Sequence, residues 1–446
     1  MGYFTEAYMA YTQEISQYRN QPEQLEALYQ AARRERQVDQ FSADLSECYQ
    51  QAPDNLLFAA WYYRLQGAPE EVKKKAGAGA NWKLAVPLAI ANSLIFWGLS
   101  DPDLMLRDHL PVLALLGAPI IALFVMGFLA LTAHKHYRRS LVLGAALSLV
   151  VALALILAYR VASIHYTYYL DLMVPHLALL SWAAVGAALT GLKSSAGNRH
   201  AFLIKSIEVF ITGGLYLIAG VAFGMITLGM FAALSITLPD VLLRLIAAGG
   251  AGLIPVIAVV TIYDPTAEPE AQDFKQGLSR FIGTMMRLLL PLTLGVLVIY
   301  ILIIPFNFLE PFHNRDVLIV YNIMLFAIMG LLVGATPIEL PDLSPKLQAA
   351  LRSGILAVAG LAVLVSLYAL SALIYRTATG GITINRLTML GWNVINISLL
   401  LLLLTTQLRT DRRLWNERLK WVFSLGAYAY VGWTLFVILI TPIIFR

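Results

Sequence analysis

The chain has 446 residues, of which 59% are apolar and only 13% are charged. Soluble domains carry roughly 25% charged residues, so the composition excludes an ordinary soluble protein. The formal charge is +5, but the lysines and arginines lie mostly between apolar blocks and in residues 1–75, where membrane orientation explains them. Base-reading motifs are absent, so we expect no nucleic-acid partner. Cys48 is the only cysteine, which excludes a disulfide framework or a cysteine-based metal site within one chain.

Residues 1–75 are predicted to form a small helical cytoplasmic head, followed by a linker at 76–81. Pro22 and Glu23 suit the first turn of a helix. A second helix is expected over 38–50 and a third over 56–65, separated by Pro-Asp-Asn. This pair weakly resembles a tetratricopeptide-type hairpin, and one such hairpin cannot bury a stacked core alone. The head is therefore expected to pack on a protein partner or on the membrane domain.

Residues 82–446 are predicted to form a transmembrane domain, because apolar blocks long enough to cross a hydrocarbon layer of roughly 30 Å follow one another to the C-terminus. The chain is thus expected to be an all-α, polytopic membrane protein in contact with membrane lipids, and residues 1–65 lack the apolar core of a cleavable signal peptide. We place about eleven transmembrane helices at 82–100, 111–133, 140–160, 172–192, 206–226, 241–262, 281–304, 317–337, 353–375, 387–407 and 422–445.

The distribution of lysine and arginine predicts the orientation, since these residues favour cytoplasmic loops. Eleven spans place the basic connections inside, the N-terminus in the cytoplasm and the C-terminus outside, in a bacterial inner membrane. Residues 203–263 could hold two helices or three, and charge parity favours two. Leu228–Pro239 is then expected to be a short outer loop or a re-entrant segment. Arg409–Trp421 combines five cations with apolar residues and suits a helix lying on the inner leaflet.

Familiar catalytic patterns are missing from the sequence. It contains no Walker A loop, HExxH zinc helix, GxSxG elbow or DDxxD pair. His134 and His136 do not share a helical face, and Arg138 and Arg139 beside them repel a cation. We expect no metal site, no cofactor and no catalytic residue of the common kinds.

Ionisable residues inside apolar spans are the better candidates for a substrate or ion site, because burying them in lipid is costly. Glu208 lies three residues after Lys205, so the two either form a local ion pair or present a proton- or cation-binding carboxylate to a cavity. Asp240 and Arg244 repeat this pattern four residues apart. Arg287 has no partner on its own helix and must reach the membrane surface or a neighbour such as Glu208.

Asparagines and glycines add further candidates. Asn393 and Asn396 share one helical face and could bond Asn322 or Tyr300 of other spans, either as packing contacts or as contacts to a substrate. Glycines concentrate in the fifth and sixth spans, where they permit close packing or a break around a substrate. They are Gly213, Gly214, Gly220, Gly224, Gly249, Gly250 and Gly252.

The segment Leu367–Leu390 ends one span with an arginine and opens the next with Gly-Ile-Thr-x-Asn-Arg. It resembles the closing signature of the four-one-five-three family, bacterial multi-pass membrane proteins that share a domain of unknown function. The family turn usually reads Tyr-Gly-Leu-Thr-Pro-Asn-Arg, whereas Gly380 and Ile384 stand here in place of its Tyr and Pro. The resemblance implies a polytopic membrane fold and no particular activity.

The same turn has a physical interpretation that does not depend on the family. Two glycines permit a tight reversal, and Thr383 can cap the following helix by accepting an amide hydrogen bond. Arg376, Asn385 and Arg386 either close the hairpin or form an outer site for an anion or lipid headgroup.

Three functions follow from these features. The first is a permease or transporter-like protein for a small or amphiphilic substrate, with Glu208 and Arg287 as its polar core and Arg376 and Arg386 at its outer mouth. The second is a membrane-anchored sensor or scaffold that presents residues 1–75 to a partner protein. The third is an enzyme that modifies envelope lipids. No motif assigns a substrate, a coupling ion or an oligomeric state.

Overall fold

The computed structural model describes residues 10–34, 37–75, 80–275, 277–340, 343–411 and 414–446. The chain divides into two compact units, Met1–Gly79 and Ala80–Arg446, which we call the head and the membrane unit. Their boundary lies close to the predicted one. Most of the predicted linker, residues 76–79, lies outside the described residues.

The head consists of four described helices around one core. Asn55 begins the last of them by accepting hydrogen bonds from the amides of residues 57 and 58, each at 3.0 Å. Leu25, Phe41, Trp61 and the thiol-bearing Cys48 are all buried in the core between the helices. The helices are α1 (Ala10–Gln17), α2 (Pro22–Arg34), α3 (Val38–Gln51) and α4 (Leu56–Lys75), so the last extends past its predicted end at residue 65.

The membrane unit is almost entirely helical. Its described residues include 11 helices that are long and apolar enough to span a membrane, which confirms the all-α, polytopic architecture. A two-stranded antiparallel ribbon pairs Met105 with Pro111 and Leu106 with Leu110. The elements are α5 (Trp82–Leu99), β1 (Met105–Leu106), β2 (Leu110–Pro111), α6 (Val112–Ala133), α7 (Tyr137–Ala158), α8 (Ser163–Thr190), α9 (Ala196–Ala233), α10 (Asp240–Arg244), the π-helix η1 (Leu245–Gly249), α11 (Gly250–Ile262), the short 3₁₀-helix η2 (Pro269–Ala271), α12 (Gly277–Ile303), the 3₁₀-helix η3 (Ile304–Asn307), α13 (Glu310–His313), α14 (Arg315–Ala335), α15 (Pro345–Gly380), α16 (Ile384–Arg409), α17 (Trp415–Leu439) and α18 (Thr441–Ile444).

The disputed stretch 203–263 holds two long helical segments and not three. One is α9, and the other is the continuous run of α10, η1 and α11. The predicted outer loop at Leu228–Pro239 is too long, because α9 continues to Ala233 and leaves only a short connection before Asp240. The reason is local: the residues from 228 to 233 are apolar and contain no proline, so nothing ends the helix there.

The prediction of a surface helix at Arg409–Trp421 was wrong. The described part of this segment is the end of α16 and the beginning of α17, with residues 412–413 outside the described chain. Trp415 and Leu419 are only 2% and 1% exposed and lie in the core of the bundle. The segment therefore leads into a helix of the bundle, and Trp415 and Leu419 pack against protein. Leu414 and Trp421 of the same segment are 53% and 41% exposed.

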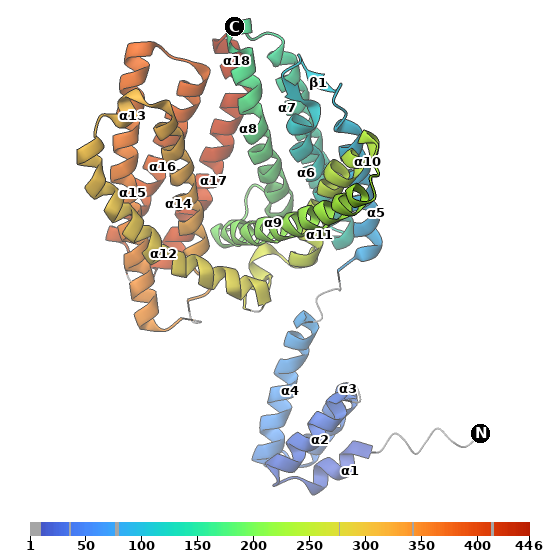
Figure 1. Ribbon diagram of the computed structural model, residues 1–446. Helices are drawn as coiled ribbons and strands as arrows, with labels where there is room; N and C mark the ends of the chain where they lie inside the picture. The colour runs from blue at the N-terminus through green and yellow to red at the C-terminus, as the bar shows by residue number, and fades with distance from the viewer. Residues whose placement is uncertain (1–9, 35–36, 76–79, 276, 341–342, 412–413) are drawn as a thin grey trace. The chain divides into compact units, whose positions relative to one another are not determined.

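Two groups of helices build the membrane unit, and α17 belongs to both. One core joins α12, α14, α15 and α16 with the first half of α17. A second joins α6, α7 and α8 with Val437 and Ile438 near the end of α17. Figure 1 shows α9 steeply inclined to α8, α15 and α17, so its first half reaches into the bundle whereas its second half has large exposed apolar side chains such as Phe223 and Met230.

Candidate functional site

The first half of α9 carries a buried ion pair. The Lys205 ammonium lies 2.8 Å from the Glu208 carboxylate, and the two side chains are 5% and 1% exposed. The Lys205 ammonium also donates to the carbonyl oxygen of Asp273 at 2.7 Å and to the hydroxyl of Ser279 at 2.9 Å. Ser279 in turn donates to Glu208 at 2.7 Å. The predicted local pair is therefore present, and its extra hydrogen bonds offset part of the cost of burying two charges.

Arg287 lies on α12 and faces the same hollow as Glu208. This hollow, which we call the Glu208 pocket, has a volume of about 460 Å³ and is lined by α9, the segment that precedes α12, α12 itself and the residues that follow α14. The structure thus brings together the two residues that the sequence proposed as a polar core. The pocket exposes polar and apolar surface in nearly equal parts, and its other polar lining residues are Gln272, Asp273, Lys275, Ser279, Arg280, Thr284, Thr336 and Glu339.

Asp240 and Arg244 do not form the ion pair that their spacing suggested. The Arg244 guanidinium lies 2.9 Å from the carboxylate of Asp101, in the connection after α5. Asp240 occupies the first turn of α10, where the positive end of the helix dipole already favours an acid. A hydrogen bond from the Asp103 amide and the Arg244 guanidinium lower the pKa of Asp101.

The asparagines of α16 belong to a neutral network between helices. Asn393 donates to the side-chain oxygen of Asn322 on α14 at 2.7 Å, as predicted. Asn396 donates to the backbone of Trp392 at 2.9 Å and accepts from the hydroxyl of Tyr430 on α17, not from Tyr300. The network continues through the Trp392 indole, which donates to His176 of α8 at 3.1 Å. These buried contacts favour the packing interpretation.

The Gly380–Gly381 turn is closed by its own residues. Gly381 has a φ of +75°, a conformation that favours glycine. The Thr383 hydroxyl accepts from the Arg386 amide at 3.3 Å, which is the predicted cap. The Arg386 guanidinium donates to the Gly381 carbonyl at 2.6 Å. Arg386 therefore stabilises the hairpin, and Arg376 and Asn385 flank it on α15 and α16.

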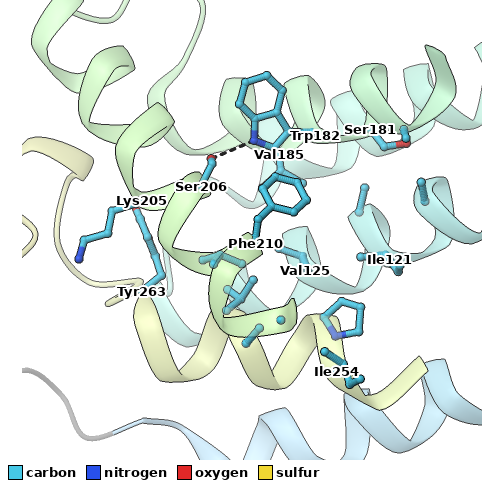
Figure 2. Close-up of a pocket in the computed structure, with 18 of the residues that line it drawn as sticks. Ile121, Val125, Ser181, Trp182, Val185, Lys205, Ser206, Phe210, Ile254 and Tyr263 are labelled. Carbon is cyan, nitrogen blue, oxygen red and sulfur yellow. Dashed lines mark hydrogen bonds between the residues drawn. The ribbon is translucent and has the colours of Figure 1, made fainter. Parts of the chain in front are cut away.

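A cavity that the sequence analysis did not anticipate lies on the other side of α9. It has a volume of about 470 Å³, is walled by α6, α8, α9 and α11, and is lined almost entirely by apolar side chains such as Ile121, Val125 and Ile254. Figure 2 shows these walls converging on one space. We call it the α9 cavity. Its volume lies within the range of small-molecule sites, roughly 300–1,000 Å³.

Glycine leaves room for part of this cavity. Gly213 and Gly214 line it, and a Cβ added at Gly214 would have no atom within 4 Å. Other glycines of the same set serve packing: a Cβ at Gly252 would lie 2.9 Å from the Cα of Ser93, and Asn92 donates to the Gly252 carbonyl at 2.6 Å. The adjacent glycines of α9 were thus the one sequence signal for the cavity.

Polar groups gather at one edge of the α9 cavity. Lys205, Ser206 and Tyr263 line this edge, and Figure 2 shows Lys205 extending away from the apolar walls. The hydroxyl of Tyr263 and that of Ser181, farther along the wall, are buried and have no hydrogen-bond partner within the described residues. A buried hydroxyl without a partner costs about 1–3 kcal/mol, so a ligand with a polar group would relieve that cost.

No family model, no curated protein and no solved structure matches this chain. The resemblance of Leu367–Leu390 to the four-one-five-three family therefore stays a prediction. The function has to be inferred from the geometry around α9.

Proposed function

We propose that the membrane unit is a permease-like protein that binds an amphiphile, with the apolar part in the α9 cavity and the polar part at Lys205. One observation supports this proposal above the others. The stem of Lys205 lines an apolar cavity of about 470 Å³, while its ammonium pairs with Glu208, which lines a polar pocket of about 460 Å³. A single helix therefore presents apolar and charged surfaces to two adjoining spaces.

The charges suit an amphiphile whose polar group is anionic. Such a group would compete with Glu208 for the Lys205 ammonium, since both are oxygen anions. Glu208 would keep the hydroxyl of Ser279 as a donor, and Arg287 of the same pocket supplies a further positive charge. Exchange of partners at Lys205 would couple occupancy of the cavity to the polar pocket, which is the step that a permease requires.

Binding is tested by filling the cavity. Purified protein is titrated with a spin-labelled single-chain carboxylate amphiphile, and quenching of tryptophan fluorescence is measured, since Trp182 lines the cavity. Gly214→Phe should abolish the Trp182-dependent part of the quenching, defined by comparison with Trp182→Phe. Gly229→Phe is the matched control on the same helix, because a Cβ there also has no neighbour within 4 Å and the residue is not among the cavity lining.

Transport is tested separately in reconstituted vesicles. We expect uptake of the same amphiphile by wild-type protein and its loss in Gly214→Phe. Equal quenching and equal uptake by wild-type, Gly214→Phe and Gly229→Phe proteins would refute the proposal. Specific binding without uptake would retain the cavity as a ligand site and refute the permease.

A sensor or scaffold is the second candidate, and a feature of the head favours it. Tyr49 stacks on Tyr62 with ring centroids 4.6 Å apart, and Tyr63 packs edge-on against both. Tyr63 is 65% exposed and Leu56 is 87% exposed. Exposed aromatic side chains of this kind are enriched at protein interfaces. Deletion of residues 1–79 distinguishes the two functions, since a permease should keep its uptake and a scaffold should lose its partner.

A further inference from the structure

A basic groove lies at the end of the membrane unit where α7 begins and α8 ends. It has a volume of about 950 Å³ and is lined by the first residues of α7 and by the connection between α8 and α9. Arg138, Arg139 and Lys193 line it together with His136. α7 begins at Tyr137, so the positive end of its dipole also lies at the groove. We call this space the basic groove.

The basic groove continues into an apolar slot. The slot has a volume of about 330 Å³ and lies between α7, α8, the beginning of α9 and α17. The two spaces share five lining residues and are therefore contiguous. The shared residues are Leu143, Ala187, Thr190, Gly191 and Leu192. Deeper in the slot the lining is aliphatic, with Val150, Leu180, Val431 and Leu435.

Two of the cations, Arg139 in the basic groove and Arg199 in the apolar slot, are held in place by hydrogen bonds within the bundle. The Arg139 guanidinium donates to the carbonyl of Ala188 at 3.3 Å, near the end of α8. Arg199 donates to the Ser194 carbonyl and lies 5.2 Å from the ring centroid of Tyr428. Arg138 and Lys193 are exposed and free to approach an anion. Among the described residues that line the groove and the slot there are four lysine or arginine side chains and no carboxylate.

The slot is separate from the α9 cavity. Trp182 and Phe202 line both spaces and stack on each other with ring centroids 5.5 Å apart. The Trp182 indole is held in place by a hydrogen bond to Ser206 at 2.9 Å. This stacked pair forms a wall, so a ligand in the slot does not require the proposed permease function.

We infer that the basic groove and the apolar slot together bind one anionic phospholipid. The phosphate-bearing headgroup lies among Arg138, Arg139 and Lys193, and an acyl chain enters the slot past Ala187. Charge complementarity selects the anionic headgroup, and the aliphatic lining selects a chain over a soluble phosphate. A zwitterionic lipid would bind more weakly because its headgroup adds a positive charge to a site that already holds four.

The inference is tested on the full-length protein in a neutral detergent, with bound lipid counted by native mass spectrometry. Wild-type protein should retain one phosphatidylglycerol in preference to phosphatidylcholine. Arg138→Gln/Lys193→Gln should weaken phosphatidylglycerol binding about thirty-fold, as expected for two cation contacts of ordinary strength. Lys135→Gln/Lys346→Gln is the matched control, because it removes the same charge from exposed residues outside the groove lining.

Two further variants test the entrance to the apolar slot and the charge of the basic groove. Ala187→Phe should block the junction, and lipid binding should be lost. Leu192→Glu introduces a negative charge at a side chain that is 71% exposed, so it should weaken binding without disturbing the core. Equal loss of lipid binding in Arg138→Gln/Lys193→Gln and in the control double variant would overturn the inference, as would unchanged binding by Leu192→Glu. Equal occupancy by glycerol phosphate would also overturn it, since a soluble anion has no chain to fill the slot.

Discussion

Two polar clusters lie inside the membrane unit, and they differ in charge and in what surrounds them. The cluster on α9 is ionic, with Lys205 and Glu208 at its centre, and it borders two hollows. The cluster on α16 is neutral, and its asparagine and aromatic side chains bond one another across α8, α14 and α17. Both looked alike in the sequence as polar residues within apolar spans. Their surroundings separate a candidate site from a packing network.

The comparison shows that hydrogen-bond satisfaction alone does not mark packing, because the bundle also supplies the partners of Lys205 and Glu208. The neutral network needs no ligand because each asparagine finds a partner on another helix or on its own backbone. The ionic cluster differs because it stands beside the buried hydroxyl of Tyr263, which has no hydrogen-bond partner in the part of the chain that the structure describes. Substitutions should therefore affect the two clusters by different amounts and in different assays.

The largest effect is expected when one partner of the buried pair is removed. Glu208→Ala leaves the Lys205 ammonium buried without its counter-charge, so it should destabilise the membrane unit by about 3–5 kcal/mol. Lys205→Met/Glu208→Met removes both charges and should recover most of that loss. Thermal unfolding in detergent measures both variants. A double variant as unstable as Glu208→Ala would show that the pair itself, not the stranded charge, carries the stability.

A smaller loss is expected from crowding beside the neutral network. A Cβ at Gly391 would overlap the ring of Trp433, while a Cβ at Gly360 would have no atom within 4 Å. Gly391→Ala should therefore cost about 1–3 kcal/mol by forcing α16 and α17 apart. Gly360→Ala should be neutral or slightly stabilising, as alanine favours a helix. Equal unfolding temperatures for the two variants would contradict the close approach of Gly391 to Trp433.

Loss of the side-chain hydrogen bonds of Asn396 in the neutral network should destabilise the protein less than the crowding at Gly391. Asn396→Leu removes the acceptor of the Tyr430 hydroxyl and the donor to the Trp392 carbonyl and keeps similar volume, so we expect about 0.6 kcal/mol and at most about 1.7 kcal/mol for each bond. The same variant should bind the amphiphile like the wild type, because Asn396 does not line the α9 cavity. If Asn396→Leu unfolds like the wild type but no longer binds the amphiphile, Asn396 belongs to the binding site and the neutral network is not a packing network alone.

Local patterns predicted much of this architecture. Span length and hydropathy gave the 11 helices because each helix must satisfy its own backbone in lipid. Spacing on one helix predicted the Lys205–Glu208 pair correctly and the Asp240–Arg244 pair wrongly. The Asp101–Arg244 pair and the α9 cavity could not be predicted, because they depend on which helices meet in three dimensions. The surface helix at Arg409–Trp421 was predicted wrongly for the same reason, because the sequence does not show that a neighbouring helix buries Trp415.

The smallest effect is expected at the ion pair of Arg244 and Asp101, whose side chains are 22% and 38% exposed. Asp101 has a lowered pKa, so its contribution to stability is present above the unfolded pKa of about 3.9 and is lost as the pH falls through the folded value. Arg244→Gln removes the partner but not the Asp103 amide that also lowers this pKa. The variant should therefore unfold slightly below the wild type at neutral pH, and the difference should shrink in acid. A difference that grows below pH 4 would mean that Arg244 acts through a group other than Asp101.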